Sequence, residues 1–153
     1  MTRLYVVEDH PIMRQTLCAF LKRQPGVTLC GDAGSAEAAL AQIDEAKPEI
    51  MLIDMAMARM SGLELLTLLQ EIHPSILCVV LSGHAERRYV ERAMLLGARA
   101  YILKGETDEL VVALQRVMDG QIYVSKAVAD IMASLAVRKL AVLVTLQKCI
   151  PAP

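Results

Sequence analysis

The chain of 153 residues fits one domain of ordinary size with a short extension, and its 55% hydrophobic content can fill a core. That content, beside 22% charged residues, excludes a disordered chain. The net charge of -1 supplies no basic field, so we expect no direct nucleic-acid binding. No signal-peptide pattern is visible, and no apolar run reaches the roughly 18 residues of a membrane span. The four cysteines lack metal-ligand spacing, and we expect a cytoplasmic protein without membrane contact.

Short apolar runs alternate with longer stretches of helical pattern through most of the chain. The runs predict buried strands at residues 4–7, 27–31, 50–53, 76–81 and 100–103. Helical spacing predicts helices over residues 11–24, 36–47, 62–73, 86–96 and 107–119. Pro11 suits a first helical turn, Ser35 and Ser61 are expected N-caps, and Glu64 completes a capping box. Five strand–helix units in succession predict an α/β fold, a doubly wound parallel sheet with helices on both faces.

Polar side chains follow these strands where each strand ends. Glu8 and Asp9 follow the first strand, Asp54 the third, Ser82 the fourth and Lys104 the fifth. Ligands of such sheets bind at the carboxyl ends of the strands, so these side chains are the candidates for a site. Three converging carboxylates would repel one another unless a cation lay among them. Oxygen donors without thiol or imidazole favour Mg²⁺.

The same residues suit phosphoryl transfer. Asp54 stands alone at the end of the central strand and can act as a carboxylate nucleophile toward a phosphoryl donor. Lys104 would hold a phosphoryl oxygen as a point charge, and Ser82 would add a hydroxyl donor. A cation would neutralise charge on the transferring group, which is the main help that this reaction needs.

In this order, these residues resemble the CheY-like receiver domain of two-component response regulators over residues 1–122. Segments 8–11 and 120–125 further resemble its NarL/FixJ (LuxR-type) subfamily. The matching positions are Glu8-Asp9, Asp54, Met57, Gly62, Ser82-Gly83, Gly97-Ala98, Tyr101 and Lys104. The resemblance implies a flavodoxin-like, five-stranded parallel sheet in the order 2-1-3-4-5.

The resemblance also implies a metal site. Asp9 and Asp54 would bind Mg²⁺ directly, together with the backbone carbonyl of Ala56, while Glu8 would act through water. Mn²⁺ could substitute for Mg²⁺. Ala56 and His84 occupy positions that commonly tune how long the phosphoryl group persists in this family.

A switch is the third implication of the resemblance. Asp54 would be the phosphoacceptor, and a sensor histidine kinase would be the phosphoryl donor. Ser82 and Lys104 would bind the phosphoryl group, and Tyr101 would turn inward as the face of the fourth helix and fifth strand rearranges. Such a chain is not an enzyme, beyond limited catalysis of its own phosphorylation and dephosphorylation.

Three alternatives remain open. The chain could be the receiver part of a NarL/LuxR-type transcriptional regulator truncated before its DNA-binding domain. It could be a haloacid-dehalogenase-like phosphohydrolase, although the Asp-x-Asp motif of that family is missing after the first strand. It could also be a degenerate receiver that acts only as a protein-binding scaffold, against which the intact acidic, hydroxyl and lysine positions argue.

Residues 123–153 are expected to form a linker and a tail helix rather than a complete DNA-binding domain. Ser125 is the expected N-cap of this helix, and Val128, Ile131 and Met132 follow at helical spacing. The apolar stretch 140–146 would be unfavourable if exposed, so we expect it to pack on the receiver or to pair with a second chain in a homodimer.

Overall fold

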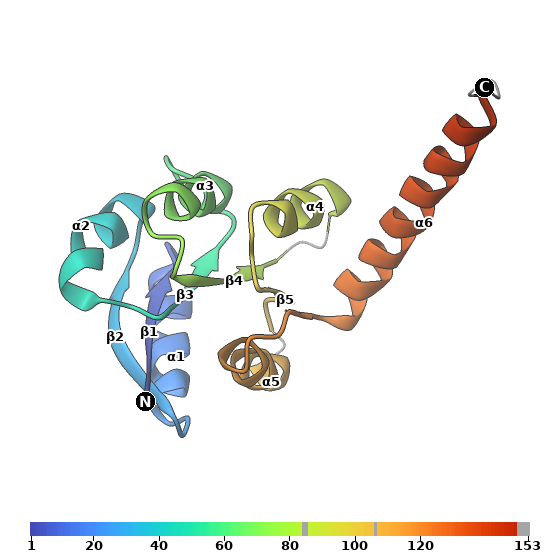
Figure 1. The fold of residues 1–153 in the computed structure, drawn as a ribbon. Helices are drawn as coiled ribbons and strands as arrows, with labels where there is room; N and C mark the ends of the chain where they lie inside the picture. Colours follow the sequence, from blue (N-terminus) through green and yellow to red (C-terminus); the bar gives the residue numbers. More distant parts are fainter. Residues whose placement is uncertain (84–85, 106, 150–153) are drawn as a thin grey trace.

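The computed structural model describes residues 1–83, 86–105 and 107–149, and Figure 1 shows how its helices and strands are arranged. The strands are β1 (Thr2–Val7), β2 (Val27–Ala33), β3 (Ile50–Asp54), β4 (Leu77–Ser82), β5 (Ala100–Leu103) and β6 (Tyr123–Val124). The helices are α1 (Pro11–Lys22), α2 (Ala36–Ala46), α3 (Gly62–Ile72), α4 (Arg87–Leu95), α5 (Thr107–Met118) and α6 (Lys126–Cys149). His84, one of the residues expected to tune the phosphoryl lifetime, lies outside the described residues.

The strands form one parallel sheet in the order β2-β1-β3-β4-β5-β6. The expected order of the first five strands is confirmed. The sequence does not predict the sixth strand, because residues 123 and 124 fall within the expected linker. Two residues are too few for a periodic pattern, and pairing creates this strand: Tyr123 lies beside Ala100 and Val124 beside Tyr101.

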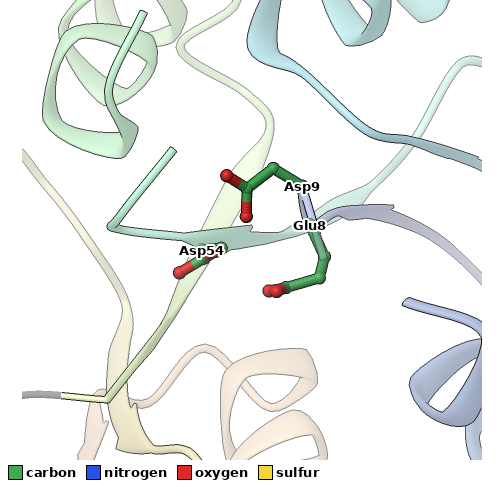
Figure 2. Close-up of side chains that lie close together, drawn as sticks. All are labelled: Glu8, Asp9 and Asp54. Atoms are coloured by element: carbon green, nitrogen blue, oxygen red, sulfur yellow. The ribbon is translucent and has the colours of Figure 1, made fainter. Parts of the chain in front are cut away.

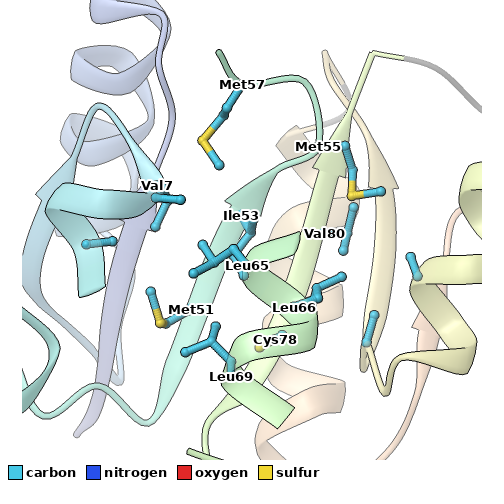
Figure 3. Packing of buried hydrophobic residues seen from close by; sticks show 14 of the residues in the cluster. Val7, Met51, Ile53, Met55, Met57, Leu65, Leu66, Leu69, Cys78 and Val80 are labelled. Carbon is cyan, nitrogen blue, oxygen red and sulfur yellow. The ribbon is translucent and has the colours of Figure 1, made fainter. Parts of the chain in front are cut away.

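Successive strand residues point to opposite faces of the sheet, so two separate hydrophobic layers form. On one face, Val7, Met51, Ile53 and Val80 pack beneath α2, α3 and α4, as the close-up of this layer in Figure 3 shows. The opposite face packs against α1 and α5. Its buried strand residues are Leu4, Val6, Val27, Ile50, Leu52, Val79, Leu81, Ala100 and Ile102. With both faces covered, the central strands must be apolar throughout, which explains their continuous hydrophobic runs.

Most of the predicted helix starts are confirmed. Pro11 occupies the first turn of α1, and the hydroxyl groups of Ser35 and Ser61 accept hydrogen bonds from the amides of Ala38 and Glu64. The position predicted for Ser125, directly before α6, is confirmed, but the predicted cap by its side chain is wrong. Its Oγ is buried and has no hydrogen-bond partner within the part of the chain that the structure describes.

The physical reason is that Ser125 continues the β6 ladder. Its amide donates to the carbonyl of Tyr101 at 3.1 Å, and its own carbonyl accepts from the amide of Ala129 at 2.8 Å. These bonds hold the residue at the base of α6 with its side chain fully buried. The backbone of Ser125 thus connects the sheet to α6, while its hydroxyl group does not cap the helix.

The tail helix α6 projects away from the sheet in Figure 1. Its first turns pack against the domain, where Val128 is fully buried and Arg87 Nη2 on α4 donates to Ser134 Oγ at 3.1 Å. Farther along, Leu140 and Leu143 are 63% and 60% exposed. The expectation that this stretch packs on the receiver is therefore wrong, because the straight helix carries it beyond the globular part. Among the described helices, none combines the length and the apolar composition needed to cross a membrane.

Candidate functional site

The predicted site residues converge at the carboxyl edge of the sheet. Glu8 and Asp9 directly follow β1, and Asp54 is the last residue of β3. Carboxylate oxygens of these three residues all lie within 4.8 Å of one another, and Figure 2 shows the three side chains together. The register explains the convergence, because Val7 pairs with Ile53 and the carboxylates therefore leave the sheet at neighbouring levels.

Lys104 reaches this acidic cluster from the adjacent side. Its Nζ lies 3.2 Å from Glu8 Oε1 and 3.2 Å from Asp54 Oδ1. Its backbone amide donates to the carbonyl of Ser82 at 2.8 Å, which keeps it level with the end of β4. Burial alone lowers the pKa of the Lys104 ammonium group, but attraction to Asp54 and Glu8 outweighs burial and leaves the pKa raised. Lys104 therefore stays charged and offsets part of the negative charge.

The Glu8 side chain is as deeply buried as that of Asp54. It is 1% exposed, and burial together with the Asp54 carboxylate raises the pKa of Glu8 to about 7, against the opposing effect of Lys104. Without a further cation, the cluster thus holds more negative charge than Lys104 alone can balance.

Two buried oxygens identify what the cluster lacks. Glu8 Oε2 and Asp54 Oδ2 have no hydrogen-bond partner among the described residues, although buried carboxylate oxygens are normally paired. A divalent cation would satisfy oxygens of this kind, and an all-oxygen donor set suits Mg²⁺ better than softer metals. The residues present therefore fit a small hard cation.

The loop after β3 orients the Asp54 side chain. The amide of Ala56 donates to Asp54 Oδ1 at 3.1 Å. Gly62 closes this loop tightly, since a Cβ there would lie 2.6 Å from the Asp54 carbonyl oxygen and 2.8 Å from Met55 Cα. Met57 belongs to the same loop, and its side chain, labelled in Figure 3, is buried. The Ala56 amide contact was not predicted, and the proposed ligand role of the Ala56 carbonyl stays a prediction.

Ser82 ends β4, and Tyr101 lies within the neighbouring strand β5. Ser82 is buried at the end of β4, on the wall of a cavity of about 420 Å³ that Met55, Ala56 and Tyr89 also line. Tyr101 is fully buried, and burial raises the pKa of its hydroxyl group, against the opposing effect of a hydrogen bond with Ser82. The Tyr101 ring is therefore already inside the protein without phosphorylation. The sequence analysis expected the ring to turn inward only on phosphorylation.

Arg14 is a residue of this region that the sequence did not single out. Its Nη1 donates to the backbone carbonyl of Glu8 at 2.8 Å. A signal was available in the sequence: Pro11 starts α1, so residue 14 ends the first turn and can reach back toward the preceding loop.

Comparison with known proteins identifies response regulators as relatives of this chain. The response regulator receiver domain family matches residues 4–115. Transcriptional regulatory protein MctR of Rhizobium johnstonii is 33% identical over 129 residues, covering 84% of this chain and 60% of MctR. Response regulator GacA of Pseudomonas viridiflava is 34% identical over 131 residues, covering 85% of this chain and 61% of GacA. Nitrate/nitrite response regulator protein NarL of Escherichia coli (strain K12) is 30% identical over 132 residues, covering 86% of this chain and 61% of NarL. The chain thus spans about 60% of the length of these curated relatives.

Solved structures share the fold. A LuxR-family two-component response regulator from Aurantimonas sp. SI85-9A1 superposes with a TM-score of 0.84 at 25% identity, covering 90% of this chain and 99% of that one. The isolated REC domain of RcsB from Salmonella enterica serovar Typhimurium gives a TM-score of 0.79 at 19% identity, covering 85% of this chain and 97% of that one. At this identity the likeness supports the fold alone. The relatives of this chain are NarL- and LuxR-type regulators. The chain belongs to the response regulator receiver domain family of two-component systems.

Proposed function

We propose that this receiver accepts a phosphoryl group on Asp54 from a sensor histidine kinase, with Mg²⁺ bound beside it. One observation carries the proposal. The buried Asp54 carboxylate has one oxygen held by Lys104 Nζ at 3.2 Å and by the Ala56 amide at 3.1 Å, while its other oxygen has no partner among the described residues. A carboxylate fixed in this way is oriented for attack and still has an oxygen free to bind.

The transfer exchanges one bond to phosphorus for another. An oxygen of Asp54 forms the new O–P bond while the P–N bond to the kinase histidine breaks, and the histidine nitrogen keeps the electron pair. Lys104 then moves from the two carboxylates toward a phosphoryl oxygen, and the Ser82 hydroxyl donates to another. The Ala56 amide, already directed at Asp54, provides a third donor at the same place.

The acidic cluster would hold the cation. Asp9 and Asp54 would bind it directly, the Ala56 carbonyl would add a backbone oxygen, and Glu8 would contribute through water. When bound, Mg²⁺ neutralises negative charge on the transferring group, and Mn²⁺ can take its place. The unpartnered oxygens of Glu8 and Asp54 support this assignment.

The output is a change at the face formed by α4 and β5. Tyr101 connects this face to the site through its hydrogen bond with Ser82. When Ser82 turns toward a phosphoryl group, Tyr101 loses that partner, and the packing of α4 against β5 changes. On this proposal the protein is a switch rather than an enzyme, and it acts in the cytoplasm.

Intact-mass measurement after incubation with acetyl phosphate tests the proposal. The wild-type chain should gain the mass of one phosphoryl group when Mg²⁺ is present and should not gain it in EDTA. Asp54→Asn should gain nothing under either condition. A folded wild-type chain that binds Mg²⁺ but stays unmodified, both here and with a cognate kinase, would instead support a protein-binding scaffold.

A second candidate is the receiver part of a transcriptional regulator. MctR carries the name of a transcriptional regulatory protein, and this chain covers 60% of its length. On this view, phosphorylation of Asp54 controls DNA binding by further residues of a longer protein. Finding a helix-turn-helix segment encoded in frame after these residues would favour this candidate.

A further inference from the structure

The Arg14 side chain forms a bridge beside the acidic loop. From the first turn of α1, Nη1 donates to the Glu8 carbonyl at 2.8 Å, while Nε lies 3.2 Å from Oδ2 of Asp32. Asp32 belongs to β2, so one guanidinium group connects the end of β1 to the neighbouring strand. Its side chain is 24% exposed, which places it partly within the protein rather than in bulk water.

Through this bridge, both backbone polar groups of Glu8 have partners. Its amide donates to the carbonyl of Ala33 at 3.0 Å, and its carbonyl accepts from Arg14. The peptide plane between Glu8 and Asp9 is therefore fixed at its carbonyl oxygen. Because Asp9 follows at once, that plane sets where the Asp9 carboxylate can lie relative to Asp54.

Gly34 provides the space for the guanidinium group. A Cβ on Gly34 would lie 2.5 Å from Arg14 Nη1 and 3.4 Å from its Cζ. The backbone of Gly34 does not have a positive φ, so alanine is acceptable there except for this contact. Substituting Gly34 therefore displaces the Arg14 side chain without changing Arg14.

We infer that Arg14 is a positioning residue for the cation site, which it shapes through the Glu8 carbonyl without touching the cation. This inference rests on the proposed function, since it concerns the same Mg²⁺ site. Groups that orient metal ligands from behind affect metal affinity by about tenfold or more when removed.

Electrostatics alone would act in the opposite direction. Arg14 is a cation near a site for another cation, so its charge by itself disfavours Mg²⁺, although Asp32 offsets part of that charge. If charge dominated, removing Arg14 would tighten Mg²⁺ binding. If positioning dominates, its removal weakens binding, so the sign of the change distinguishes the two effects.

The test is an Mg²⁺ titration of the full chain, followed by the ¹H–¹⁵N NMR shifts of the Glu8, Asp9 and Asp54 amides. Arg14→Met removes the donors and the charge, whereas Arg14→Lys keeps the charge but cannot form the same bridge. Gly34→Ala displaces the guanidinium group. Arg3→Met is the matched control, because Arg3 Nη2 donates to the Ala46 carbonyl at the opposite end of β1.

We expect Arg14→Met and Gly34→Ala each to raise the Kd for Mg²⁺ by about tenfold, with the double variant no worse than either single one. Arg14→Lys should shift the Kd in the same direction by a smaller factor, and Arg3→Met should leave it unchanged. An unchanged or lower Kd in folded Arg14→Met would overturn the positioning role alone. A wild-type chain without saturable shifts at these amides would overturn the cation site, and the proposed function with it.

Discussion

The Glu8 carboxylate and the Lys104 ammonium group meet at 3.2 Å although 96 positions separate them in the sequence. The contact joins the ends of β1 and β5, which are separated in the sheet by β3 and β4. Asp54 lies between them, so every charge in the cluster depends on the others.

Removing the lysine should destabilise the metal-free protein. Lys104→Met leaves the buried Glu8 and Asp54 carboxylates facing each other, and we expect a loss of about 2 kcal/mol in the free energy of unfolding, reduced from fully buried cases because Lys104 is partly exposed. Urea denaturation in EDTA would measure it, with exposed Lys126→Met as the control. Saturating Mg²⁺ should restore most of the lost stability. Even then, Lys104→Met should be phosphorylated at least tenfold more slowly than the wild-type chain. Equal stability of Lys104→Met and wild type in EDTA would contradict the ion pairs.

The pH dependence of stability should report on Glu8. Its pKa of about 7 in the folded protein lies above its ordinary value of 4.5, so the folded state binds more protons in this range. Glu8 therefore contributes to the unfolding free energy of the metal-free protein fully below about pH 4.5. This contribution is lost as the pH rises through 7, and the total loss is about 1 to 3 kcal/mol.

Glu8→Gln should remove this slope, because the amide does not titrate. Urea denaturation between pH 5 and 8 in EDTA would show it, with Glu45→Gln as the matched control. A slope that survives unchanged in Glu8→Gln would assign the titration to another group.

The tight turn after β3 predicts a steric effect at Gly62. Gly62→Ala places a methyl group against the Asp54 carbonyl oxygen and the Met55 Cα, and both are backbone atoms that can yield only if the loop shifts. We expect a loss of about 1 to 3 kcal/mol in stability and slower phosphorylation of Asp54. Thermal unfolding of Gly62→Ala beside Gly83→Ala would check this, because a Cβ on Gly83 meets nothing within 4 Å. Equal melting temperatures in the two variants would disprove the close approach.

Tyr101 should separate phosphorylation from output. Tyr101→Phe keeps the buried ring and removes only the hydroxyl group that bonds with Ser82. Phosphorylation should proceed normally in this variant, while the phosphorylation-induced change in amide hydrogen exchange over α4 should be weakened. Tyr101→Ala is less informative, since emptying a fully buried site costs about 3 to 5 kcal/mol. A full exchange response in Tyr101→Phe would exclude the hydroxyl group as the connection.

The exposed part of α6 should influence self-association. Leu140 and Leu143 are separated by one helical turn and are largely exposed, so a second copy of the chain remains our expectation for what covers them. Analytical ultracentrifugation should show a dimer for the wild-type chain and a monomer for the variant with Leu140→Glu and Leu143→Glu. A monomeric wild-type chain at high concentration would refute pairing through this helix.

Sequence predicted best the features that depend on continuous patterns. The runs ending at Asp54 and Ser82 are buried on both faces, so the continuous apolar pattern predicted where these strands end and which polar residues stand at their ends. Predictions were poorer where a contact depends on three-dimensional reach. The two residues of β6 become a strand only through β5, and the bridge from Arg14 depends on how α1 packs beside β2.

The outcomes for α6 have the same cause. Ser125 has the residue type and position of an N-cap, but a backbone bond to Tyr101 fixes it in the core. The apolar stretch that follows predicts burial, but α6 projects away from the sheet beyond the buried Val128 (Figure 1), and Leu143 is 60% exposed. Neither orientation is contained in a local sequence pattern.

The account depends most on which residue carries the phosphoryl group. An acyl phosphate formed with acetyl phosphate and Mg²⁺ can be trapped with hydroxylamine, which converts the modified carboxylate to a hydroxamate that peptide mass mapping can locate. We predict a single hydroxamate, at Asp54, that is absent without Mg²⁺. A hydroxamate at Asp9, Asp32 or another carboxylate, with Asp54 unmodified, would contradict the assignment of Asp54 as the phosphoacceptor.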